Sequence, residues 1–106
     1  MNLVIRQAAG LDRLIHEPAR LMIVSLLYAV EKADFLYLLN ETGLTKGNLS
    51  AHLSRLEEAG YVNIEKTYRG KLPLTLISLT STGREAFETY RRQLEKIVAS
   101  LSEENT

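Results

Sequence analysis

Apolar residues recur at helical spacing in the first half of the chain. Between Leu11 and Glu31 they return every three or four residues, and Pro18 interrupts this recurrence once. Because proline is well tolerated in the first turn of a helix, the pattern predicts two helical pieces, the second of which begins at Pro18. Another apolar stripe covers residues 35–39 and ends near Gly43, which suits the left-handed cap of a helix. The first half is therefore expected to consist of short helices.

A further amphipathic helix is predicted over residues 46–59. Thr45 is a residue type that caps helix starts, and Gly60 is a residue type that ends helices. Three leucines of this helix fall at positions i, i+4 and i+7 and so share one face: Leu49, Leu53 and Leu56. The opposite face is mainly polar. One side of the helix is therefore expected to pack, and the other is free to contact a partner.

The second half of the chain reads as a hairpin followed by a long helix. Two runs rich in β-branched and aromatic residues, 61–68 and 74–80, predict two paired strands. The basic segment 69–73 between them contains one glycine and one proline and is expected to be an exposed turn. A last helix with one apolar side then runs to about Leu101. Together the elements predict an α+β fold, mainly helical, with a two-stranded β-hairpin and a long C-terminal helix.

The composition fits one soluble domain. The chain has 106 residues, of which 45% are hydrophobic, and this is enough to form a core without disulfides. The absence of cysteine excludes disulfide and thiolate sites and favours an intracellular location. There is no secretory signal and no apolar run long enough to span a membrane, so we expect a cytoplasmic protein without a membrane partner. Basic and acidic residues balance at 13 each, so net charge alone does not indicate nucleic acid.

The order of helix, short turn, amphipathic helix and basic-tipped hairpin is that of a winged helix-turn-helix domain. The second helix of such a pair fits the major groove of B-DNA, where each base pair shows a distinct pattern of donors and acceptors. Residues 44–62 and 77–84 also resemble the small winged-helix regulators related to the MarR and ArsR groups. The resemblance implies a homodimeric transcriptional regulator that binds double-stranded DNA sequence-specifically, with recognition helix 46–59 in the major groove. The wing, residues 69–73, would lie on the DNA backbone or in the minor groove.

The candidate DNA-binding residues lie on the polar face of the recognition helix or at the tip of the hairpin. Lys46 is in the first helical turn, where a cation opposes the helix dipole, so a phosphate contact explains it better than a structural role. Arg55 lies opposite the leucines and could reach a phosphate or a guanine edge, or could be a solvated side chain paired with Glu58. Members of the two groups often carry a basic residue where Ala51 stands. The candidates are Thr45, Lys46, Gly47, Asn48, Ser50, Ala51, Ser54, Arg55, Arg69, Gly70 and Lys71.

The C-terminal helix is expected to form a dimer. A helix of about five turns extends beyond a small winged domain and has little of its own chain to pack against. The N-terminal aliphatic segment offers matching surface, so we expect an isologous dimer built from both ends of each protomer. The chain is read as one domain, residues 1–106, with a DNA-binding core at 11–80 and a dimerisation helix at 82–101, to which residues 1–16 contribute. The interface candidates are Leu3, Ile5, Leu11, Leu14, Phe87, Tyr90, Leu94, Ile97, Val98 and Leu101.

Other classes of function fit less well. A winged-helix module that binds protein without DNA is the alternative, and zero net charge and the acidic pair Glu57–Glu58 support it. An enzyme is not expected, because the chain lacks cysteine, a glycine-rich phosphate loop and the HExxH and GxSxG motifs. Asp12 and His16 are one helical turn apart and are expected to pair structurally; a third ligand is missing, so neither a metal nor another cofactor is expected. A small-molecule effector, in a cleft between the dimer helices and the winged domain, stays open as a partner.

Overall fold

The computed structural model describes residues 3–104, and these form five helices and one three-stranded antiparallel sheet. The helices are α1 (Leu3–Ala9), α2 (Pro18–Ala29), α3 (Phe35–Thr42), α4 (Lys46–Glu58) and α5 (Ser81–Glu104). The strands are β1 (Ala33–Asp34), β2 (Val62–Arg69) and β3 (Leu72–Leu79), in the order β1-β3-β2. This confirms the predicted α+β, mainly helical winged helix fold, with its hairpin wing and its long C-terminal helix.

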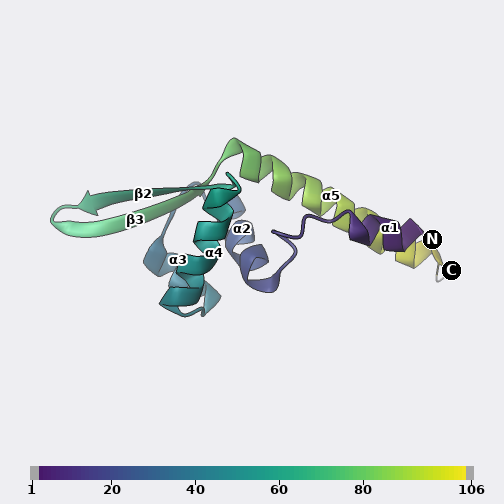
Figure 1. The fold of residues 1–106 in the computed structure, drawn as a ribbon, viewed down its shortest axis with the longest axis horizontal. Coiled ribbons are helices and arrows are strands. Elements are labelled where there is room, and N and C mark those ends of the chain that lie inside the picture. Colours follow the sequence, from purple (N-terminus) through teal and green to yellow (C-terminus); the bar gives the residue numbers. More distant parts are fainter. Residues whose placement is uncertain (1–2, 105–106) are drawn as a thin grey trace.

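The molecule is elongated, with principal extents of 60 × 26 × 20 Å. Helices α2, α3 and α4 pack together in the middle, and the hairpin of β2 and β3, here called the wing, projects from them on one side (Figure 1). On the other side α5 extends away from the bundle, and α1 packs alongside it (Figure 1). The wing therefore lies at one end of the molecule, and α1 with the last part of α5 lies at the other.

Short-range capping fixes the ends of α3 and α4, as the sequence predicts. Gly43 adopts a left-handed conformation with φ of 68° and ends α3. The Thr45 side chain then accepts a hydrogen bond of 3.1 Å from Asn48 N and so caps α4. At the other end Gly60 N donates to Glu57 O and the next amide donates to Leu56 O, both at 2.9 Å, which is the Schellman arrangement. The helix-turn-helix pair is thus defined by local chemistry.

The segment before α2 differs from the prediction of a helix. Residues 11–16 form turns, because one carboxylate oxygen of Asp12 accepts hydrogen bonds from Leu14 N and Ile15 N at 2.8 and 3.3 Å and competes with helical pairing. Pro18 opens α2 as predicted, and it forces Glu17 into an extended conformation. The helix that packs near this end of the chain is α1, which lies upstream of the predicted segment.

The hairpin strands of the wing extend further toward the tip than predicted, and the turn between them is shorter. The Cα register pairs Arg69 with Leu72 and Tyr68 with Pro73, so the turn consists of Gly70 and Lys71 alone and not of residues 69–73. Gly70 has φ of 63°, and positive φ at only the first central residue is typical of a type II′ hairpin turn. Pro73 fits within β3 because β1 pairs with that strand only at residues 76–77, which leaves its outer edge free near the tip.

The hydrophobic core joins all three regions of the molecule. The three predicted leucines of α4 are buried against α2 and the sheet. The ring of Phe87 on α5 lies 5.0 Å from the ring of Tyr28 on α2, measured between centroids, and Tyr90 is buried beside it. Because these contacts link α5 to the middle bundle, the C-terminal helix starts from a fixed position relative to the recognition helix.

Candidate nucleic-acid interface

Helix α4 presents its candidate DNA-binding residues on one exposed face. The three leucines hold the opposite face in the core, so the orientation of the helix is set by their burial. The Arg55 side chain makes no hydrogen bond or ion pair with any residue in the described part of the chain, so the alternative in which it pairs with Glu58 is not formed. All eight helix candidates are exposed: Thr45, Lys46, Gly47, Asn48, Ser50, Ala51, Ser54 and Arg55.

The structure of the chain itself explains one of the two candidate glycines. A Cβ atom built on Gly47 would meet nothing within 4 Å, so packing inside the chain does not require glycine there. Open space in front of α4 is what close approach by another molecule would need. Gly70, in contrast, is explained by its own backbone conformation, because its positive φ closes the hairpin turn. Its contribution to the site is the shape of the wing.

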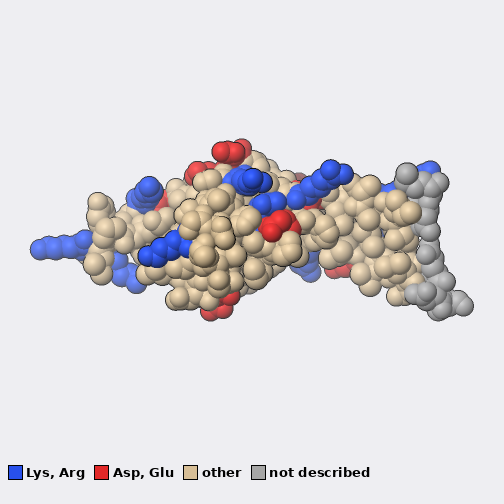
Figure 2. Space-filling model, turned by 60° about the horizontal axis from the view of Figure 1, so that its bottom comes forward, with Lys and Arg blue, Asp and Glu red and all other residues tan. Residues whose placement is uncertain are grey.

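The tip of the wing holds basic residues away from the recognition helix. Arg69, Gly70 and Lys71 are all exposed at the tip. Basic side chains gather at the wing end of the molecule on the face shown in Figure 2, and the sequence has no acidic residue from Lys66 to Arg84. The wing therefore carries a local positive charge, although the net charge of the whole chain is zero. A local positive charge of this kind favours contact with phosphates.

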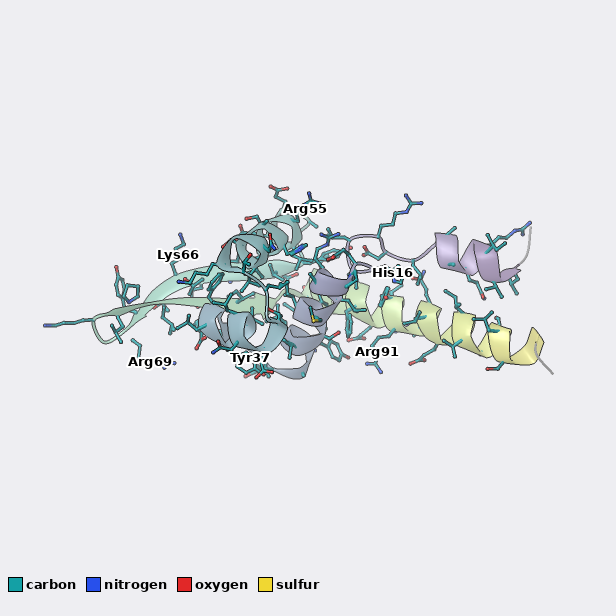
Figure 3. The ribbon with its side chains drawn as sticks, turned by 90° about the horizontal axis from the view of Figure 1, so that it is seen from below. His16, Tyr37, Arg55, Lys66, Arg69 and Arg91 are labelled. Atoms are coloured by element: carbon teal, nitrogen blue, oxygen red, sulfur yellow. The ribbon has the colours of Figure 1, made fainter. Side chains whose placement is uncertain are left out.

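A cleft of about 640 Å³ lies between α4 and the wing. Ser50 and Ser54 line it from the helix, and Lys66 and Thr75 line it from the strands. Lys66 points to the same side of the wing as Arg55 and to the side opposite Arg69 (Figure 3). Sequence reasoning missed Lys66, although it lies two positions after Ile64 on β2 and residues two apart in a strand share a face. The cleft places a cation and hydroxyls beside the recognition helix, together with the carboxylate of Glu57.

A polar cluster behind α4 fixes the helix to the start of α2. The buried Arg20 donates from Nε to Leu14 O at 2.6 Å and from a guanidinium nitrogen to His52 Nδ1 at 3.1 Å. Glu17 lies 3.8 Å from the same guanidinium, and the backbone N–H of Arg20 holds the pKa of Glu17 below its ordinary value. His52 is half-buried in this cluster.

Tyr61 forms a junction at the root of the wing. Its hydroxyl donates to Asp12 at 2.5 Å, its amide donates to the end of α4 at Leu56 O, and its carbonyl accepts from Thr80 N at 3.0 Å. Burial and the bond to Asp12 raise the pKa of Tyr61 to about 12, so its hydroxyl keeps its proton at neutral pH. The first turn of α5 also packs directly on the Tyr61 carbonyl at Gly83. One residue therefore sets the wing relative to the recognition helix.

The residues considered for a metal are used in structural contacts. Asp12 binds the turn and Tyr61, while His16 Nδ1 lies 2.7 Å from the Tyr90 hydroxyl, so the expected pairing of the Asp12 and His16 side chains is not formed. Among the residues that the structure describes, no group of three histidine, cysteine or acidic side chains could hold a metal ion. In the same residues no helix is both long and apolar enough to cross a membrane.

The ten dimer candidates divide by their burial within one protomer. Leu11, Phe87, Tyr90 and Ile97 are already buried, because the segment before α2 and the helices α1 and α2 pack onto α5 in the same chain. They therefore offer no free surface to a partner, which corrects the expectation that α5 lacks packing within its own chain. Leu14 and Leu94 are half-buried. Four candidates remain between 45% and 62% exposed: Leu3, Ile5, Val98 and Leu101.

The comparisons with known proteins agree with this geometry. Residues 19–98 match the family described as winged helix DNA-binding domain. The uncharacterized protein MJ0432 of Methanocaldococcus jannaschii is 38% identical over 78 residues, which is 74% of this chain and 85% of that protein. The solved structure of a transcriptional regulator homologue from Pyrococcus horikoshii OT3 has a TM-score of 0.84 and 26% identity, and the match covers 92% of this chain and 96% of that one.

The regulator NadR, solved in complex with 4-hydroxyphenylacetate, shares the fold at a TM-score of 0.70 and 22% identity, over 98% of this chain and 73% of that one. The family match covers most of the chain, including the recognition helix and the wing. The chain therefore belongs to the winged helix DNA-binding domain family.

Proposed function

We propose that the protein is a homodimeric transcriptional regulator that binds a specific sequence of double-stranded DNA. Helix α4 would enter the major groove, and the wing would contact the backbone or the minor groove. The observation that carries the proposal is the exposed polar face of α4, held outward by three buried leucines beside a basic wing. An exposed helix beside a basic hairpin is the arrangement with which winged helices read a groove and hold the flanking phosphates.

The residues of α4 take different roles in this proposal. Asn48 and Ser50 lie near the helix start, the part of a recognition helix that reaches base edges first, and we assign base contacts to them. Lys46 and Arg55 are exposed cations and bind phosphates, or a guanine edge in the case of Arg55. Thr45 contributes by capping the helix that carries these side chains.

The dimer would form at the opposite end of the molecule. The exposed side chains Leu3, Ile5, Val98 and Leu101 leave apolar surface on α1 and α5. A shallow, mainly apolar hollow of about 490 Å³ on α5, lined in part by Leu94 and Val98, continues this surface. In this proposal residues 1–106 form one domain, residues 11–80 read DNA, and residues 82–101 with residues 1–16 join two protomers.

Selection of bound sequences from a pool of random duplexes tests the proposal. A two-fold symmetric dimer should enrich an inverted repeat whose half-site centres are about 10 bp apart or a multiple of that distance. Affinity for the enriched duplex should fall steeply as salt rises, because bound counterions are released when cations meet phosphates. A pool that stays random after repeated rounds would refute sequence-specific binding.

A protein-binding module is the second candidate function. It is favoured by Glu57 and Glu58, two exposed acidic residues at the end of the recognition helix, where they would repel phosphates. A module of this kind would bind its protein partner with an affinity that changes little with salt concentration.

A small-molecule effector is a further proposed partner. A cleft of about 420 Å³ between Gly10–Asp12 and the first half of α5 supports it, as does the ligand in the NadR structure. Release of the enriched duplex by added small carboxylic acids would test this part of the proposal.

A further inference from the structure

The tip of the wing exposes large apolar side chains beside its cations. Tyr68 and Leu72 are each 70% exposed, the highest value for any large apolar residue that the structure describes. Single exposed apolar residues are common on protein surfaces. Here, however, two of them lie within five residues at the end of a hairpin that projects clear of the bundle (Figure 1). Nothing in the described part of the chain covers this end of the wing.

The register of the strands places an apolar side chain on each face of the tip. Arg69 and Leu72 are cross-strand partners, so the cation and the leucine share one face. Tyr68 and Pro73 are partners on the other face. The two-residue turn at Gly70 keeps the end of the hairpin only two strands wide. The tip is therefore a narrow apolar edge with Arg69 on one face and Lys71 at the turn.

The charge around the tip selects the kind of partner. No acidic residue occurs between Lys66 and Arg84, so the tip is complementary to a polyanion. The minor groove of DNA combines closely spaced phosphates with stacked bases, and proteins that bend DNA insert apolar side chains there, between base pairs, from basic elements. A winged helix whose second helix lies in the major groove carries its wing to the neighbouring minor groove or backbone.

We propose that the wing tip is a DNA-bending wedge. Leu72 enters a base-pair step from the minor groove and partly unstacks it, Arg69 binds the groove beside it, and Tyr68 and Pro73 lie against the sugars of one strand. The inference rests on the proposed function, and it adds an activity to DNA binding. Because pyrimidine–purine steps such as TA and CA unstack most easily, Leu72 would also select such a step on each outer side of the site.

The bend is measured by energy transfer between dyes at the two ends of the duplex enriched from the random pool. The wild-type protein should bend this duplex by roughly 20–90°. Leu72→Thr places a β-branched residue, which suits a strand, at this position and removes the apolar wedge, so the duplex should stay bound but become nearly straight. Leu72→Met keeps an apolar wedge at this position and should keep the bend. Leu36→Gln, which removes a similarly exposed leucine from α3, should leave the bend unchanged.

A second measurement needs no variant. A 2-aminopurine base placed at the flanking step fluoresces more strongly when it loses its stacking partner, and the wild-type protein should raise its emission at that step only. A duplex that is bound but stays straight and shows no rise would overturn the wedge and leave the proposed function intact. A bend that Leu72→Thr does not reduce would also overturn it, as would self-association that this variant abolishes. Failure to bind any duplex would defeat the proposed function itself.

Discussion

The close approach between α5 and Tyr61 predicts that Gly83→Ala strongly destabilises the fold. Gly83 is buried in the first turn of α5, and a Cβ atom on it would lie 2.0 Å from Tyr61 O and 2.8 Å from Tyr61 C. An ordinary contact begins near 3.4 Å, so the two segments would have to separate by more than 1 Å. The atoms in the way belong to the main chain and cannot rotate aside, as the end of a side chain could.

The expected loss of stability follows from three contributions. Overpacking of a closely packed contact typically costs about 1–3 kcal/mol. The hydrogen bond from Thr80 N to Tyr61 O would be strained as well, and such a bond contributes about 0.5–1.5 kcal/mol. The better helix propensity of alanine offsets at most about 1 kcal/mol. The net free energy of unfolding should therefore fall by about 2 kcal/mol, which lowers the Tm of a domain of this size by roughly 8–16 °C.

Urea and thermal unfolding at one fixed protein concentration measure this effect, because a dimer would make both transitions depend on concentration. Gly47→Ala is the matched control: it is the same substitution in the first turn of a helix, where the new Cβ atom meets nothing within 4 Å. That variant should unfold at the wild-type urea concentration or slightly above it. If Gly83→Ala unfolded together with the control, the close approach would not exist in solution and the reasoning would fail.

Four further predictions concern DNA, assembly and pH. Asn48→Ala should cost about 1–3 kcal/mol on the enriched duplex and much less on a scrambled one, and equal losses in titrations of both would refute base reading. Replacing Arg69 and Lys71 with alanine should reduce the log-log salt slope by about 1 per lost phosphate contact in each protomer, whereas an unchanged slope would mean that the wing does not touch DNA. Val98→Glu should yield monomers in sedimentation at micromolar concentration, and a dimer that persists would place the interface elsewhere. Folding raises the pKa of the Tyr61 hydroxyl from its ordinary 10.0 to about 12. Its contribution to stability is therefore complete below pH 10 and is lost as pH rises toward 12. The urea midpoint of the wild type should fall over this range for that reason, and the midpoint of Tyr61→Phe should lack this contribution to the fall.

The parts of the fold that sequence predicts well are those fixed by neighbouring residues. Gly43, Thr45 and Gly60 act on amides and carbonyls within a few positions of themselves, so they mark the ends of α3 and α4 before any tertiary contact is known. The type II′ turn at Gly70 is equally local. The predicted turn is too long because Pro73 is typical of a loop. The structure shows that β1 does not pair with β3 at Pro73, and a strand tolerates proline at such an unpaired edge.

The parts that sequence reasoning missed depend on residues far apart in the chain. Strand β1 has two residues and is a strand only because Ala33 and Asp34 pair with β3. The turns around Asp12 are held partly by Tyr61, 49 positions away. The apolar stripe of α5 shows that something covers it, but periodicity cannot say whether the cover is α1, α2 or a second protomer. For that reason Phe87 and Tyr90 were expected at an interface and lie in the core.

The junction at Tyr61 has a consequence for how binding sites can change over time. Its amide, carbonyl and hydroxyl groups bind the end of α4, the end of the sheet and the segment before α2. The distance between the recognition helix and the wing is therefore fixed. A single base pair inserted between the DNA positions that the helix and the wing contact would shift one position by about 3.4 Å along the DNA axis. Regulated promoters should therefore exchange bases within a half-site and should rarely gain or lose one.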